Sequence, residues 1–398
     1  MILTKGFKDF FQSESLSGIL LIGLTVLTII TANFILHEQY TAFWESEVLG
    51  KRLDFWINDV LMTFFFLTVG LEIEREIYVG ELSNIKQALL PIIAAVGGMI
   101  VPALVYISIN IHSGSVSGFG IPMATDIAFS LTILTIVASK IPSTLKVFLT
   151  ALAIIDDIGA IIIIAVFYTK NFSILFLIVA LLIVLMLVLF NRIGLKNLIF
   201  YLIPGIFLWI CLYKSGIHPT ITGVVLAFLI PFGKGDKKSP SSKVEDILQK
   251  PVAYFILPLF VIANTGIIMT SNDFSQLLTV NSLGIILGLV IGKPLGITLF
   301  SWAAVKIKLC SLFENLTISH ILGAGLIAGI GFTMSIFIAL LAFDSPEIIK
   351  LSKLSIIVAS FISAILGIIY ISVTFSLKKK KMTSNTKNKL LKPSKEAL

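Results

Sequence analysis

The chain alternates between long apolar runs and short polar connections. About 20 predominantly apolar residues cross a bilayer as a helix, and twelve runs come near that requirement. The pattern therefore predicts an all-α polytopic membrane protein with about twelve transmembrane helices. Their approximate cores are residues 16–36, 55–71, 88–109, 119–137, 147–168, 173–190, 198–212, 216–232, 252–269, 283–304, 321–343 and 354–377.

The composition supports this prediction and excludes soluble proteins. Of the 398 residues, 57% are hydrophobic and 13% are charged, and the mean hydropathy is +1.02. We expect a single transmembrane domain over residues 1–377, followed by a basic cytoplasmic tail at 378–398 that is disordered. Cys211 and Cys310 lie in or beside apolar runs without paired spacing, so they indicate neither redox chemistry nor a zinc site.

The net charge of +8 reflects membrane topology, and we expect no nucleic-acid partner. With twelve spans, 23 of the 30 Lys and Arg residues lie on the side shared by both termini, and six lie on the opposite side. The positive-inside rule then predicts that both termini are cytoplasmic. The remaining basic residue, Lys293, falls inside a span.

The fifth run, at 147–168, carries two adjacent acids near its centre, Asp156 and Asp157. A charged side chain at the bilayer centre costs about 2.5–3.5 kcal/mol on insertion scales, so this pair requires compensation nearby. Adjacent helical residues point about 100° apart, which lets one acid face a partner while the other faces a cavity. Such a pair indicates a functional site.

Two runs contain sequences that break helices. In the fourth run, the segment GFGIPMAT precedes the intramembrane acid Asp126, and the related pattern GIGFTMSIFIA covers 329–339 in the eleventh run. Interrupted backbone is tolerated at membrane depth only where protein or a wet cavity surrounds it. The two runs are an odd number of spans apart, so their topologies are opposite. We therefore expect inverted repeats at about 88–168 and 283–377 whose broken helices cross at the midplane, as in secondary transporters.

Other polar residues inside the spans leave alternatives open. Lys293, in the middle of the tenth run, should pair with an acid or titrate, so a structural ion pair with Asp156 and a part in proton transfer are both possible roles. The charged cluster at 72–76 is either a solvated helix end or a funnel that attracts cations and responds to pH. Asn264 is expected to bond a neighbouring helix, and Thr150 to bond a carbonyl one turn back.

Four segments in the same order, MATDIAFSL, LAIIDDIGAIIIIAVFYT, IGKPLGI and GIGFTMSIFIA, together resemble the NhaA family of bacterial Na+/H+ antiporters over essentially the whole chain. That family is itself a standard example of the inverted-repeat layout, so the two arguments are not independent. The resemblance implies a multi-pass protein of the bacterial cytoplasmic (inner) membrane. It would exchange external H+ for internal Na+ or Li+ electrogenically, under pH regulation, for sodium and pH homeostasis. It would be a homodimer in the lipid bilayer, without enzymatic activity or cofactor.

The resemblance also assigns roles to individual residues of this sequence. Asp157 and Asp156 would bind the cation, Na+ or Li+, and the protons, with Thr125 close by. Asp126 and Lys293 would compensate the charged ends of the broken helices, or Lys293 would pair with Asp156. The pH-sensing positions would be Glu72, Glu76, Glu245 and His218.

The residue types suit this exchange, because a hard cation prefers carboxylate and carbonyl oxygens and a carboxylate also binds protons. One departure is Glu74, which stands where relatives often carry a basic residue and puts the pH profile in doubt. A Na+-coupled solute symporter on the same fold is the nearest alternative and would show solute dependence. An intramembrane aspartyl protease would carry an acid directly after a Gly-x-Gly pair, where this chain has Ile121. A passive channel would need weak, multi-site binding.

Overall fold

The computed structural model describes residues 5–136, 141–169, 172–233, 235 and 239–390, and describes side chains only within 16–374, except those of residues 38, 271, 272 and 274. In this part of the chain, nine helical segments are long and apolar enough to cross a membrane, or ten if a bent pair counts as one span. The prediction of a helical polytopic membrane protein is confirmed. The described residues of the chain form one sheet, a hairpin of β1 (Glu47–Val48) and β2 (Lys51–Arg52).

The elements up to residue 167 include the interrupted fourth run and the helix that carries the acid pair. Segments labelled η are short 3-10 or π stretches that continue or connect the α-helices. They are α1 (Lys5–Ile30), η1 (Thr31–Leu36), α2 (Glu38–Glu45), α3 (Leu53–Phe55), η2 (Trp56–Leu61), α4 (Met62–Tyr78), η3 (Glu81–Ser83), α5 (Ile85–Asn110), η4 (Val116–Met123), α6 (Ile127–Ile136) and α7 (Ser143–Phe167).

The elements after residue 167 include the second interrupted segment and the helix that begins at Lys293. They are α8 (Ile174–Ile193), α9 (Ile199–Ser215), α10 (Ile221–Leu229), α11 (Pro240–Pro251), η6 (Val252–Ile256), α12 (Leu257–Thr265), α13 (Ser271–Gln276), α14 (Val280–Leu287), η7 (Gly288–Gly292), α15 (Lys293–Lys306), α16 (Ile318–Ala328), α17 (Phe332–Ala342) and α18 (Pro346–Leu390).

One predicted span is shorter than the sequence pattern indicates. The run at 198–212 forms the 17-residue helix α9, which covers the predicted length, but the run at 216–232 forms only the nine-residue helix α10. Proline limits the second run, because the residue before a proline is pushed out of the helical region. Ile230, which precedes Pro231, is extended at φ −70° and ψ 133°, so α10 ends there.

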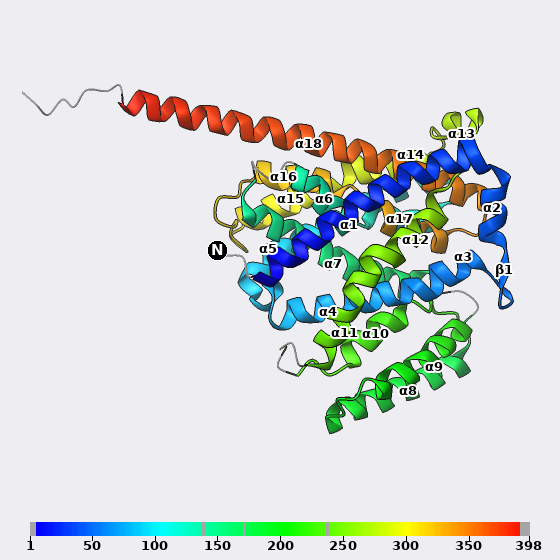
Figure 1. The fold of residues 1–398 in the computed structure, drawn as a ribbon. Coiled ribbons are helices and arrows are strands. Elements are labelled where there is room, and N and C mark those ends of the chain that lie inside the picture. Colours follow the sequence, from blue (N-terminus) through cyan, green and yellow to red (C-terminus); the bar gives the residue numbers. More distant parts are fainter. Residues whose placement is uncertain (1–4, 137–140, 170–171, 234, 236–238, 391–398) are drawn as a thin grey trace, which may run out of the picture.

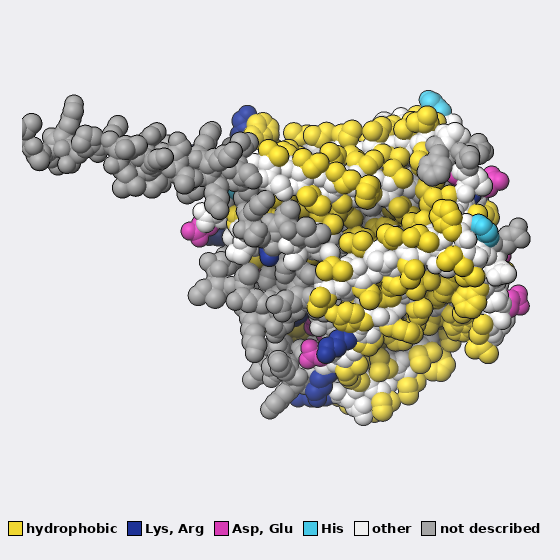
Figure 2. Space-filling model, turned by 45° about the horizontal axis from the view of Figure 1, so that its top comes forward, with side chains coloured by type: hydrophobic (Ala, Val, Ile, Leu, Met, Phe, Trp, Pro, Cys, Tyr) yellow, Lys and Arg dark blue, Asp and Glu magenta, His cyan; other side chains and the backbone are white. Residues whose placement is uncertain are grey.

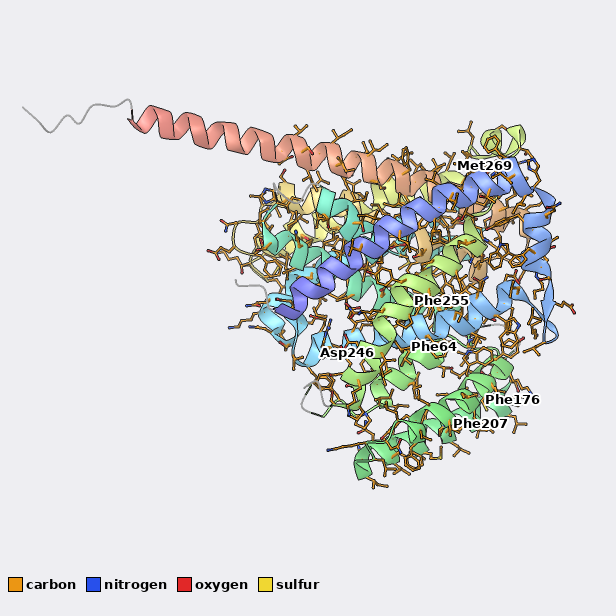
Figure 3. All side chains as sticks on the ribbon, viewed as in Figure 1. Phe64, Phe176, Phe207, Asp246, Phe255 and Met269 are labelled. Carbon is orange, nitrogen blue, oxygen red and sulfur yellow. The ribbon has the colours of Figure 1, made fainter. Side chains whose placement is uncertain are left out.

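The outer surface is apolar over a broad band. Figure 2 shows hydrophobic side chains over most of the visible face, with the visible charged side chains toward its ends. The α8–α9 hairpin lies at the edge of the bundle (Figure 1). Only 11% of the most apolar 18-residue stretch of α8 is buried inside the protein. Phe64, Phe207 and Phe255 on α4, α9 and η6 are 41%, 57% and 59% exposed (Figure 3). Such surfaces face lipid.

A close crossing of α5 and α15 places Lys293 in the interior. A Cβ atom on Gly97 would lie 2.4 Å from the carbonyl oxygen of Gly296, and one on Gly296 would lie 2.1 Å from that of Gly97. Only glycine at both positions permits this approach, which is typical of helix pairs in membranes. Lys293, one turn before Gly296, is fully buried as a result.

α18 extends past residue 377, where we expected the transmembrane domain to end. Its backbone is helical to Leu390, and Figure 1 shows this end projecting away from the bundle. The described part of 378–398 thus differs from the disordered tail that we predicted. The lysine run at 378–381 is compatible with helix because lysine has a high helix propensity. Residues 391–398 lie outside the described part.

Candidate functional site

Two interrupted helical segments meet in the interior of the bundle. Residues 124–126 are non-helical between η4 and α6, and the axes of α16 and α17 differ by 54° at the break between them. The Asp126 amide donates to the Ile330 carbonyl at 2.8 Å, and the Ser335 hydroxyl donates to the Ile121 carbonyl at 2.7 Å. Each segment therefore satisfies backbone groups that the other segment's break leaves free, as interrupted backbone in a membrane requires.

Asp126 joins the amino-terminal ends of the two helices that follow the breaks. Its Oδ1 accepts from the Phe129 amide of α6 at 3.0 Å. Its Oδ2 accepts from the Thr333 amide of α17 at 3.0 Å and from the Thr333 hydroxyl. A carboxylate is favourable here because helix amino termini present unpaired N–H groups and a partial positive charge.

Lys293, the first residue of α15, contacts the carboxyl-terminal end of η4, the segment before the first break. Its Nζ donates to the carbonyl of Met123, the last residue of η4, where the partial charge is negative. The same Nζ lies 3.0 Å from Asp156 Oδ2, and both side chains are fully buried. Lys293 thus makes both contacts that the sequence presented as alternatives, one to the helix end and one to the acid.

Asp156 and Asp157 have different surroundings although they are adjacent on α7. Asp156 Oδ2 accepts from the Thr125 hydroxyl at 2.6 Å as well as pairing with Lys293, and the Thr125 hydroxyl is also 3.1 Å from the Ala328 carbonyl. The Oδ1 atoms of Asp156 and Asp157 are both buried without a hydrogen-bond partner. An unpaired carboxylate oxygen in a low-dielectric interior is costly, so both oxygens are free to take a proton or a cation.

Asp157 lines a cavity of about 60 Å³ whose walls also include Thr125, Asp126 and Thr333. A water needs roughly 10–15 Å³ of such space, so the cavity has room for a few waters or for a cation with part of its hydration shell. Within the described residues, no three His, Cys, Asp or Glu side chains cluster in metal-binding geometry. A cation at Asp157 would therefore complete its coordination with hydroxyl, carbonyl or water oxygens.

The same cavity reaches a charged cluster on α4 and α11. Glu72 and Glu245 line it, and both are paired with Arg75, at 3.8 Å and 2.9 Å. Glu76 also pairs with Arg75, at 3.4 Å, and its Oε2 accepts from the Glu81 amide at 2.9 Å. Burial and the nearby Glu76 carboxylate raise the pKa of Glu81. Three of the four predicted pH-sensing residues therefore share one arginine.

The fourth predicted residue, His218, is not part of this cluster. Its Nε2 lies 3.4 Å from Asp59 Oδ1 in η2, which precedes α4, whereas Glu72 and Glu76 are near the other end of α4. Its Nδ1 is 2.8 Å from the Thr220 hydroxyl. His218 and Asp59 line a separate cavity of about 330 Å³.

Several residues that complete the site were not identified from the sequence. Thr333 supplies two donors to Asp126, and Arg75 binds three glutamates; the Gly-rich break before Thr333 and the charge density around Arg75 were the available signals.

Asn264 donates to Asn58 on η2 at 2.8 Å, so its predicted contact with a neighbouring helix is confirmed. The prediction for Thr150 is wrong, because its hydroxyl has no partner.

Comparisons with known proteins agree on one family. Residues 8–371 match the family model described as Na+/H+ antiporter 1. The chain is 56% identical over 371 residues to "Na(+)/H(+) antiporter NhaA 1" of Flavobacterium johnsoniae, covering 93% of this chain and 97% of that protein. It is 52% identical to "Na(+)/H(+) antiporter NhaA" of Dechloromonas aromatica, with 93% and 96% covered, and 46% identical to the protein of that name in Escherichia coli, with 93% and 98% covered.

Proposed function

The chain belongs to the Na+/H+ antiporter 1 family, and on that premise we propose that it exchanges external H+ for internal Na+ or Li+ across the bacterial cytoplasmic membrane. The exchange is electrogenic, with more protons entering than cations leaving, and serves sodium and pH homeostasis. One observation carries the proposal: Asp157 is buried with an unpartnered carboxylate oxygen, and it lines the cavity that Glu72 and Glu245 also line.

The proposed architecture is a single domain over residues 1–377 with twelve spans, in which the short helices α9 and α10 serve as the seventh and eighth. Inverted repeats cover about 88–168 and 283–377. The contacts between the two interrupted segments support this arrangement, because each break supplies the partners for the other. Both termini are cytoplasmic by the positive-inside rule, and the functional unit in the bilayer is a homodimer.

Exchange follows from competition at one pair of acids. Na+ or Li+ entering the cavity from the cytoplasmic side binds the carboxylate of Asp157 and displaces its proton, because one carboxylate cannot hold both at full strength. Thr125 and Asp156 lie beside this position and complete the site. When the site opens to the other side, external protons displace the cation. Alternating access then needs only a movement of the interrupted helices around a fixed site.

Lys293 supplies the second proton in this scheme. With the cation absent, its ammonium pairs with Asp156 at 3.0 Å; the cation competes for Asp156 and the lysine then releases a proton. Lys293→Arg tests this step, because a guanidinium does not deprotonate in proteins. The variant should exchange fewer protons per cation, measured from the potential at which net transport stops. An unchanged ratio would contradict the step and leave the pair structural.

The charged cluster around Arg75 acts as the pH sensor at the cytoplasmic mouth. Glu72 and Glu245 line the entrance and share Arg75 with Glu76, so protonation of any of the three changes the charge that an entering cation meets. His218 would sense pH at the opposite end through Asp59. Glu76→Gln and His218→Asn should therefore shift the pH profile of transport without abolishing it.

Proteoliposomes test the exchange itself. The lumen is made acidic, a pH-sensitive dye reports the gradient, and Na+, Li+ or K+ is added outside to wild type and Asp157→Asn. We expect Na+ and Li+, but not K+, to collapse the gradient in wild type, and none to do so in the variant. If a solute is required, or if no cation moves protons at any pH, the antiporter proposal fails and a Na+-coupled symporter takes its place.

A further inference from the structure

A second charged site lies on the face of α4 that points away from the ion cavity. Glu74 is two residues from Glu72, so the two side chains leave the helix roughly 200° apart. Glu72 lines the cavity of Asp157, whereas Glu74 lines a different, open groove of about 620 Å³. This groove lies between the end of α4, the end of α8 and the segment that follows α10.

Glu74 is buried without a compensating partner. The residue is only 4% exposed, and its Oε2 is buried with no hydrogen-bond partner. None of the ion pairs among the described residues includes Glu74, while its neighbour Arg75 satisfies three other glutamates. A buried carboxylate oxygen in this state has a strong requirement for a donor or a cation.

The opposite wall of the groove carries the opposite charge. Arg192, in the last turn of α8, lines it, and no ion pair among the described residues involves this guanidinium. Asn191 beside it uses its amide nitrogen to bond the Leu229 carbonyl at 2.9 Å, which leaves its side-chain oxygen as an acceptor. The groove therefore offers side-chain oxygens that can accept from an ammonium group and a guanidinium that can donate to a phosphate.

The surroundings of the groove match the region of lipid headgroups. Tyr78 and Phe232 line the groove, and their stacked rings have centroids 5.0 Å apart. An aromatic face attracts a cation. Phe228, which also lines it, is 44% exposed, and Leu189 and Ile193 on α8 are 50% and 73% exposed. Acyl chains attached to a bound headgroup could lie along this apolar surface.

We propose that this groove binds the headgroup of a zwitterionic lipid with a primary amine, such as phosphatidylethanolamine. The ammonium donates to Glu74 and to the side-chain oxygen of Asn191, and the phosphate binds Arg192. A purely anionic lipid would leave Glu74 unsatisfied. A quaternary amine would place methyl groups, which donate no ordinary hydrogen bond, against its oxygen.

Native mass spectrometry of the full chain in detergent tests this site, with equimolar phosphatidylethanolamine, phosphatidylcholine and phosphatidylglycerol of the same acyl chains as probes. We expect wild type to retain phosphatidylethanolamine several-fold better than the other two lipids. Glu74→Gln should reduce that retention by about tenfold, since a charge-assisted hydrogen bond is lost, while Glu47→Gln on the exposed β1 strand should leave it unchanged.

Arg192→Gln is the second variant, because Arg192 is exposed and its replacement removes no buried side chain. It should weaken phosphatidylethanolamine binding several-fold in a protein that folds as wild type does. Equal or better retention of phosphatidylglycerol by wild type would overturn the proposal, as would an undiminished phosphatidylethanolamine preference in folded Glu74→Gln. Retention of phosphatidylcholine equal to that of phosphatidylethanolamine would refute the part assigned to the primary amine.

Discussion

Replacing Lys293 by methionine should destabilise the protein, because it leaves Asp156 without its charged partner. Two unit charges 3.0 Å apart attract one another by about 5–6 kcal/mol at an effective dielectric constant near 20. Breaking a buried pair by removing one member costs roughly 3–5 kcal/mol. The Met123 carbonyl also loses its donor, so we expect a loss toward the upper end of that range.

The double variant Asp156→Asn, Lys293→Met separates pairing from packing. Asparagine keeps an oxygen that accepts from the Thr125 hydroxyl, and methionine keeps most of the lysine volume. Replacing both members of a buried pair is often close to neutral, so the double variant should recover at least about 2 kcal/mol relative to Lys293→Met.

Thermal unfolding in detergent, at one fixed scan rate, measures both effects. For a chain of this size, a loss of 3–5 kcal/mol corresponds to a fall in apparent Tm on the order of 5 °C. The reasoning would be refuted if Lys293→Met unfolded within about 1 °C of wild type. It would equally be refuted if the double variant were as unstable as the two single variants taken together.

Three further predictions concern other parts of the structure. Thr333→Val removes the hydroxyl bond to Asp126 and should cost about 1.5–3 kcal/mol, measured as a lower apparent Tm. Gly97→Ala would place a Cβ 2.4 Å from a carbonyl of α15, so it should sharply reduce the yield of folded protein in size-exclusion chromatography. Hydrogen bonds from Lys350 and Thr270 lower the pKa of Asp273 despite partial burial. A carboxyl whose pKa is lowered on folding stabilises the folded protein above its unfolded pKa of about 3.9. Lys350→Gln should therefore cost up to about 1 kcal/mol of stability at pH 7. The difference in Tm between this variant and wild type should vanish as the pH falls below 3.

Each of these three predictions has a matched control. Ser335→Ala removes a hydroxyl bond to a neutral carbonyl, so it should cost less than Thr333→Val. Gly23→Ala meets nothing within 4 Å and should fold normally. Lys86→Gln replaces an exposed lysine and should show no pH-dependent difference. If a control behaved like its test variant, the corresponding argument would fail.

The pairing at the centre of the site follows from elementary energetics. A lysine and two acids at similar depth in an apolar interior have few partners available, so a Lys293 contact with Asp156 could be inferred without a structure. The different surroundings of Asp156 and Asp157 also follow from the rotation of about 100° between adjacent helical residues. The role of Asp126 came from the family resemblance alone.

What could not be predicted depends on how helices are rotated and stacked against one another. Thr333 is 207 residues from Asp126 along the chain, and their contact depends on the register of two breaks. The rotation of α4 decides that Glu72 faces the ion cavity and Glu74 the other groove, and hydropathy does not report it for a charged helix end. Local rules also failed for Thr150, whose hydroxyl lacks the carbonyl partner expected one turn back.

The central claim is that a cation and protons compete at Asp157, and proton release on cation binding tests it most directly. Purified protein in weakly buffered detergent solution, near its pH of half-maximal transport, is titrated with Na+, Li+ or K+ while a pH dye is followed. The account predicts proton release with Na+ and Li+, little with K+, and none in Asp157→Asn. Release of the same size with K+, or undiminished release in Asp157→Asn, would contradict it.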